Sequence, residues 1–167
     1  MTAATFQRVA AALWLAAAVG CSHQPNRSPE ARIIKVLPSL LDAEGRASLH
    51  PSLYERDAYQ AFLRKESDKV AGLRFDILWR ARPASRGGQA RPLLLKLELR
   101  GGSKGGTARG SNTVVVERPI AGSQVGRRWS QVVLGPDEFR RVGEVSAWRA
   151  TLLEDQRVVA STQSFLW

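Results

Sequence analysis

The chain has 167 residues and carries 25 lysines and arginines against 15 aspartates and glutamates, which gives a formal net charge of +10 at pH 7. Its single cysteine excludes a disulfide within the chain and a zinc site built from several thiolates. A chain of this length suits one domain, which can fold without a metal or a disulfide, so we expect no metal and no cofactor.

The positive charge attracts anions such as acidic lipid headgroups, polysaccharides or nucleic acid. Of the 25 basic residues, 20 are arginines, and a GC-rich genome produces the same bias. Charge by itself therefore indicates no particular ligand. Nucleic acid is disfavoured as a partner because no stacking aromatic residues are interleaved with the arginines.

The first residues contain one basic side chain, Arg8, and are followed by the apolar run VAAALWLAAAVG, from Val9 to Gly20. A membrane-spanning helix needs about 20 apolar residues. The shorter run here is typical of the apolar region of a secretory signal peptide. We therefore predict that residues 1–20 are a signal peptide.

The apolar run ends in Ala18-Val19-Gly20-Cys21. This tetrapeptide resembles the lipobox of bacterial lipoproteins, although that family usually has leucine where Ala18 stands. The resemblance implies that Ala18, Val19 and Gly20 are recognised by a dedicated signal peptidase. It also implies that Cys21 carries the lipid and becomes the new N-terminus. The alternatives are an ordinary signal peptide followed by a free thiol, or a short buried helix.

The residue after the cysteine is Ser22. In the lipoprotein sorting of some diderm bacteria, aspartate at this position retains the protein in the inner membrane. Ser22 therefore implies a bacterial membrane protein that is lipid-anchored at the periplasmic face of the outer membrane. Residues 21–31 are polar and contain two prolines, so we predict a flexible tether.

Residues 32–167 are expected to form one domain. The first predicted strand is Arg32–Leu37, a run rich in branched side chains. In the segment HPSLYERDAYQAFLRKE, Ser52 and Glu55 have the spacing of a capping box and predict the start of a helix. The apolar stripe of this helix is expected to pack against the domain; it comprises Tyr54, Ala58 and Phe62, with Tyr59 and Leu63 beside them.

From Ala71 onward the apolar period changes to two, which is typical of β-strands. Six further strands are predicted: LRFDILWRA, PLLLKLELRG, Thr113–Arg118, Arg127–Leu134, VSAWRATLLED and RVVASTQSFLW. The polar residues Glu154-Asp155-Gln156 predict a hairpin between the last two. The segment GPDEFRRVG predicts a turn or a short helix.

Four tryptophans in this region, Trp79, Trp129, Trp148 and Trp167, are expected in the core. An exposed platform for sugars is the alternative. The pattern as a whole predicts a mainly β fold: an immunoglobulin-like antiparallel β-sandwich of about seven strands, with one amphipathic helix inserted after the first strand.

The strand series resembles immunoglobulin-like and fibronectin type III domains, most closely in its closing hairpin. The chain lacks the two core cysteines of antibody domains, and Phe139 stands near the position of their tyrosine corner without a hydroxyl. The ending WR…SFLW, together with the lipobox, also resembles an uncharacterised family of bacterial lipoproteins. That resemblance implies no activity.

The search for catalytic motifs gives a weak match. Gly101–Gly105, GGSKG, fits Gly-x-Ser-x-Gly, but strands flank it and both histidines, His23 and His50, precede it. We therefore predict that the protein is not an enzyme. Two basic, glycine-rich segments join neighbouring strands, and glycine lets an anion approach the backbone while arginine pairs with it. Their candidate anion-binding residues are Arg86, Arg91, Lys104 and Arg109.

The sequence thus predicts a membrane-anchored envelope lipoprotein that acts as a non-enzymatic protein-interaction or structural module. Its expected partners are the membrane, through the N-terminal lipid, and another envelope protein. The alternative is a binding module for an anionic glycan or lipid that uses the basic glycine-rich loops. Solvated loops without a ligand and an enzyme of unrecognised type are the remaining alternatives.

Overall fold

The structure, a computed structural model, describes residues 31–81, 92–102, 112–120 and 126–167. These residues form seven strands, two α-helices and one short 3-10 helix. In chain order the elements are β1 (Ala31–Leu41), α1 (Leu53–Lys65), η1 (Ser67–Lys69), β2 (Gly72–Ala81), β3 (Leu93–Gly102), β4 (Asn112–Ile120), β5 (Gly126–Leu134), α2 (Pro136–Val142), β6 (Glu144–Glu154) and β7 (Arg157–Gln163).

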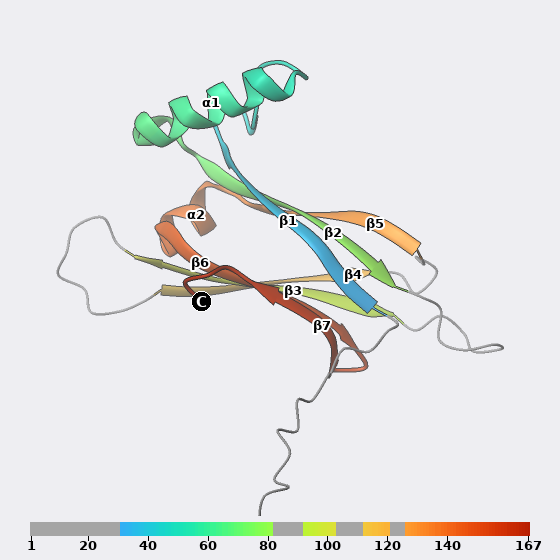
Figure 1. The fold of residues 1–167 in the computed structure, drawn as a ribbon. Helices are drawn as coiled ribbons and strands as arrows, with labels where there is room; N and C mark the ends of the chain where they lie inside the picture. Colours follow the sequence, from blue (N-terminus) through green and yellow to red (C-terminus); the bar gives the residue numbers. More distant parts are fainter. Residues whose placement is uncertain (1–30, 82–91, 103–111, 121–125) are drawn as a thin grey trace, which may run out of the picture.

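The strands form two antiparallel sheets, one in the order β1-β2-β5 and the other in the order β4-β3-β6-β7. Figure 1 shows the sheets face to face as two layers. The predicted fold class is confirmed: the chain is a seven-stranded, immunoglobulin-like β-sandwich with a helix after its first strand. The fourth strand lies beside β3, whereas a constant-type immunoglobulin domain places it in the other sheet.

The core between the sheets follows from the alternation of side chains along the strands. On β2 and β3, every second residue is apolar and points towards the other sheet. Their inward side chains are fully or almost fully buried: Leu73, Phe75, Ile77 and Trp79 on β2, and Leu93, Leu95, Leu97 and Leu99 on β3. Ala150 and Leu152 on β6 and Val132 and Leu134 on β5 complete this core.

The predicted hairpin between the last two strands is present. Glu154 is paired with Arg157, so the turn itself is the two residues Asp155 and Gln156. Both have a positive φ, at 46° and 67°, which is the backbone of the tight turn that matches the twist of a β-ribbon.

The second helix, α2, lies against the end of β3 because Gly101 has no side chain. A Cβ atom at Gly101 would overlap the backbone carbonyl of Val142, the last residue of α2. At the other end of this helix, Pro136 starts the first turn and Glu138 accepts a hydrogen bond from the backbone N–H of Gly135 at 3.3 Å. The segment predicted as a turn or a short helix is therefore a short helix fixed at both ends.

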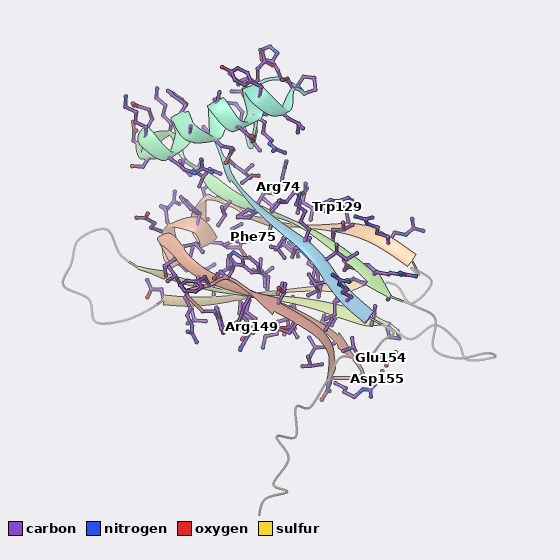
Figure 2. The ribbon with its side chains drawn as sticks, viewed as in Figure 1. Arg74, Phe75, Trp129, Arg149, Glu154 and Asp155 are labelled. Carbon is purple, nitrogen blue, oxygen red and sulfur yellow. The ribbon has the colours of Figure 1, made fainter. Side chains whose placement is uncertain are left out.

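The tryptophans are not all in the core. Trp79 is fully buried and donates its indole N–H to Ser130 at 2.8 Å. Trp148 is half-buried and packs edge-on against Phe75. The prediction was wrong for Trp167, which is half-buried outside the core, and for Trp129, whose surface is 54% exposed. It lies opposite Leu78 at an outward position of the three-stranded sheet, and Figure 2 shows it on the side of that sheet turned away from the second sheet.

The stripe predicted for α1 packs against the domain only in part, through the buried Leu63 and the partly buried Tyr59. Tyr54 is 83% exposed and Phe62 40% exposed, whereas the buried residues of this helix are Gln60 and Leu63. The reason is that α1 lies at one end of the sandwich (Figure 1), where the domain covers only a narrow face of the helix. Ser52 is the N-cap residue as predicted, but its side chain makes no capping hydrogen bond.

Trp167, the last residue of the chain, is half-buried on the outer face of the four-stranded sheet. The guanidinium groups of Arg100 and Arg149 lie 4.0 Å and 4.6 Å from the centre of its indole ring. Arg149 also donates a 2.8 Å hydrogen bond to Glu98, and this bond lowers the pKa of Glu98. Trp167 is therefore held by cation–π contacts with two arginines, of which Arg149 is oriented by the Glu98 carboxylate.

We expect Trp167→Ala to lower the free energy of unfolding by about 1–2 kcal/mol, because it removes two cation–π contacts and the burial of half an indole. The measurement is urea unfolding followed by circular dichroism. The matched control is Leu166→Ala, a neighbouring residue whose side chain is largely exposed. Equal stability of the two variants would show that the tryptophan contacts contribute nothing.

Candidate functional site

The residues that the sequence singled out as sites lie outside the described part of the chain. Ala18, Val19, Gly20 and Cys21 belong to residues 1–30. The basic residues Arg86 and Arg91 belong to residues 82–91, and Lys104 and Arg109 belong to residues 103–111. The lipid attachment and the anion-binding loops therefore stay predictions.

The strands that bound the two basic segments can be placed. β2 ends and β3 begins at the end of the sandwich where β1 starts, and β3 ends and β4 begins at the opposite end (Figure 1). Antiparallel pairing fixes this arrangement. The two segments therefore join strands at opposite ends, as expected for successive connections in a sheet.

The described residues enclose a groove of about 840 Å³ at the end of the sandwich that carries both helices. One wall comes from α1, η1 and β1, and the other from α2 and the start of β6. Its apolar lining consists of Leu40, Leu63, Val70, Leu73, Phe75, Phe139, Val145 and Trp148. A largely apolar, open concavity of this size with a few polar groups is typical of a binding site.

Gln60 fixes the first wall of the groove. Its side-chain carbonyl accepts a hydrogen bond from the backbone N–H of Leu40 at 2.8 Å. Its amide N–H₂ group donates to the backbone carbonyls of Leu40 at 2.9 Å and Ala47 at 2.8 Å. The buried Gln60 side chain thus bonds to β1 much as a neighbouring strand would, and it ties α1 to the end of the sheet.

A second network holds the segment between β1 and α1. The buried carboxylate of Asp42 accepts hydrogen bonds from the Tyr59 hydroxyl at 2.7 Å, the Arg46 backbone N–H at 2.8 Å and the Arg46 side chain at 2.8 Å. Burial by itself raises the pKa of Asp42. The hydrogen bonds from Tyr59 and Arg46 and the charge of Arg46 outweigh burial and lower this pKa from 3.8 to about 2.

The second wall of the groove depends on α2. Phe139 of this helix is partly buried against the core, and the close approach of Val142 to Gly101 holds the helix down. Beneath both walls, the floor is formed by the edge-to-face pair of Phe75 and Trp148, whose ring centres are 6.4 Å apart. The groove is therefore built from core side chains as well as from the helices.

Polar side chains line the groove beside the apolar ones. Arg64 and Ser67 stand on one rim, and Arg140 and Glu144 on the other. Arg140 pairs with Asp137, and Glu144 is the single carboxylate among the described lining residues. This arrangement can bury an apolar segment and pair with polar groups at its ends.

Two exposed apolar side chains adjoin the groove. Ser164 lines it and is held by hydrogen bonds with Trp148: its hydroxyl accepts from the Trp148 backbone N–H at 3.0 Å, and its own N–H donates to the Trp148 carbonyl at 2.9 Å. The next two residues are Phe165, fully exposed, and Leu166, 68% exposed. Exposed apolar side chains beside a concavity are typical of an interaction surface.

The sequence did not reveal this groove. Periodicity placed Leu63 on a predicted helix, and Gln60, three residues before it, shares its helix face. Nothing in the sequence marked Gln60 as a buried residue, because a glutamine on a helix is ordinarily exposed. Phe165 and Leu166 were assigned to the last strand, which ends at Gln163.

The described residues thus form an immunoglobulin-like β-sandwich with an open groove at one end. No protein-family model, curated protein or solved structure matches the chain. Within the described ranges, no helix is long and apolar enough to cross a membrane. Those same ranges contain no group of three or more histidine, cysteine, aspartate or glutamate side chains placed to hold a metal ion.

We expect the Asp42 network to make stability depend on pH in the acid range. The folded-state pKa is lowered, so the carboxylate stabilises the fold above its unfolded value of 3.8, and this contribution is lost as the pH falls towards about 2. Asp42→Asn should lower the free energy of unfolding at pH 7 by about 1 kcal/mol. This is less than the free energy that the full pKa shift would give, because solvent screens the interaction. It should also flatten the stability profile between pH 4 and pH 2.

The measurement is urea unfolding at a series of pH values. Asp57→Asn is the control, because Asp57 is an exposed carboxylate of α1 that pairs with Arg56 at the surface. An acid limb as steep in Asp42→Asn as in the parent chain would contradict the role assigned to Asp42.

Proposed function

We propose that the protein is a lipid-anchored envelope protein that binds an apolar segment of another envelope protein in its groove. It acts as a non-enzymatic interaction module. The membrane anchor is the lipid predicted on Cys21, and the binding surface is the groove together with Phe165 and Leu166. The predicted location is the periplasmic face of the outer membrane.

One observation carries this proposal. β1 begins at Ala31, where the predicted tether ends, and runs to Leu41, beside the groove. Eleven extended residues cover about 35 Å. A chain anchored through Cys21 therefore holds the groove at the end of the domain away from its point of attachment, where a partner in the periplasm can reach it.

Two features favour a protein segment as the occupant. The groove is open and mostly apolar, and aromatic side chains such as Phe139 and Trp148 are the kind that anchor protein interfaces. The exposed Phe165 and Leu166 extend the apolar surface beyond the groove. A ligand that is small and fully charged would leave this surface in water.

The anchor is tested by intact-mass analysis of the membrane-extracted protein and of a Cys21→Ala variant. We expect the parent mass to equal residues 21–167 plus acyl chains, and the variant to lack the acyl chains. A wild-type protein with an unmodified Cys21, or one cleaved elsewhere, would contradict the lipoprotein proposal and would leave an exported or unprocessed sandwich with a free thiol.

The groove is tested by photo-cross-linking in cells from single positions. Ser67 and Ser146 line the groove and are exposed, while Ala58 is exposed on the same helical wall but does not line it. We expect one common protein adduct from Ser67 and Ser146 and none from Ala58. The purified partner should bind in a salt-insensitive way, because apolar burial supplies the affinity.

The matched variant is Ser67→Trp, which places an indole in the groove mouth, against Ala58→Trp as control. The first should weaken binding of that partner by roughly tenfold or more, which corresponds to about 1.4 kcal/mol. Adducts of equal yield from Ala58, or no effect of Ser67→Trp on binding, would overturn the assignment of the groove.

A further inference from the structure

Three arginines form a row across the outer face of the three-stranded sheet. Arg32 on β1 pairs with Arg80 on β2, and Arg80 pairs with Arg127 on β5. All three side chains are exposed. Residues directly opposite in antiparallel strands point to the same face, so the three guanidinium groups stand side by side on one surface.

This row has no acidic partner among the described residues. The ion pairs found there do not include Arg32, Arg80 or Arg127. At the outward positions of these three strands the one acidic side chain is Asp76, and it already accepts hydrogen bonds from Arg74 and Gln131. Like charges placed opposite one another destabilise a sheet, so the row lowers stability unless an anion neutralises it.

The next cross-strand row adds a further cation and an exposed aromatic ring. Lys35 pairs with Leu78, and Leu78 pairs with Trp129. Lys35 is exposed and Trp129 is 54% exposed. An indole beside basic side chains suits the boundary between lipid headgroups and acyl chains, where tryptophan is enriched in membrane proteins.

The position of the row fits a membrane. It lies at the start of β1, at the opposite end of the sandwich from the groove (Figure 1). Arg32 follows Cys21 by eleven residues, a stretch that spans at most about 40 Å. A lipid on Cys21 therefore keeps this end of the domain close to the headgroups, and acidic headgroups supply the missing negative charge.

We propose that Arg32, Arg80, Arg127 and Lys35, with Trp129 beside them, form a docking surface for a membrane that contains anionic lipids. The inference rests on the proposed lipid anchor for the presence of a membrane at this end, but its test uses no acyl chain. Docking of this surface orients the domain relative to the bilayer and leaves the groove at the end of the sandwich remote from the row.

The test is binding of the full chain carrying Cys21→Ala to vesicles, measured by sedimentation. One set of vesicles contains phosphatidylglycerol and the other consists of phosphatidylcholine. The apolar segment Val9–Gly20 is present in every variant, so its own affinity for lipid cancels in each comparison. We expect tighter binding to phosphatidylglycerol vesicles and a loss of this preference as salt shortens the screening length from about 10 Å at 0.1 M to about 3 Å at 1 M.

The diagnostic variant is Arg32→Gln/Arg80→Gln/Arg127→Gln. It should bind phosphatidylglycerol vesicles about 100-fold more weakly, since each basic residue at such a surface contributes about fivefold. The matched control, Lys65→Gln/Lys69→Gln/Arg141→Gln, removes the same charge at the end that carries the helices and should lose less than about fivefold. Relief of the like-charge row should leave the melting temperature of the first variant equal to or above the parent value.

A second readout comes from Trp129. In a Trp14→Phe background, which removes the indole of the apolar segment Val9–Gly20, the fluorescence should shift to the blue on phosphatidylglycerol vesicles. Adding Trp129→Phe should remove that shift. Unchanged binding of the three-arginine variant, an equal loss in the control, or no blue shift from Trp129 would overturn the proposal. Tight binding to heparin without a preference for phosphatidylglycerol would overturn it as well, and would point to a glycan. None of these outcomes bears on the mass of the lipidated protein, so the anchor and the docking surface fail separately.

Discussion

The groove exists because one buried glutamine bonds a helix to the end of a β-sheet. Without Gln60, the backbone groups of Leu40 and the carbonyl of Ala47 would lose their hydrogen-bond partners while partly buried from water. Each such loss costs about 1–3 kcal/mol. Leu63, on the same helix face, then inserts into the lining of the groove. The helix covers the edge of the core mainly through these two residues, which explains why Tyr54 and Phe62 stay exposed.

The charged side chains on the two outer faces of the sandwich differ in whether they have ion-pair partners. On the four-stranded sheet, Lys96, Glu98 and Arg149 form ion pairs, and Arg149 is further held by Trp167. These three charges are therefore partnered within the chain. On the three-stranded sheet, the arginine row has no such ion-pair partners among the described residues, and this difference is the basis of the proposed docking surface.

Much of the fold could be predicted from the sequence, because strand geometry directly causes apolar and polar side chains to alternate along a strand that is buried on one face. The inward residues of β2 and β3, such as Phe75 and Leu97, were recognisable from a period of two. The exposure of Trp129 could not be recognised in the same way. A period of two places this residue on one of two faces, and only its pairing with Leu78 decides that its face is the outward one. Gln60 and the groove depend on where α1 docks, which local pattern does not specify. The arginine row depends on cross-strand register between β1, β2 and β5, residues far apart in sequence.

Connectivity explains why the two surfaces lie at opposite ends. In an antiparallel sandwich, every connection from one strand to the next changes end. Both helices lie in connections that leave the same end, α1 between β1 and β2 and α2 between β5 and β6. All the added structure therefore gathers at that end and walls the groove. The opposite end receives the start of β1 and the hairpin turn at Asp155 and Gln156, and it keeps the exposed arginine row. The proposed N-terminal anchor would then place one end of the sandwich near a membrane and leave the end with the groove available to the proposed partner.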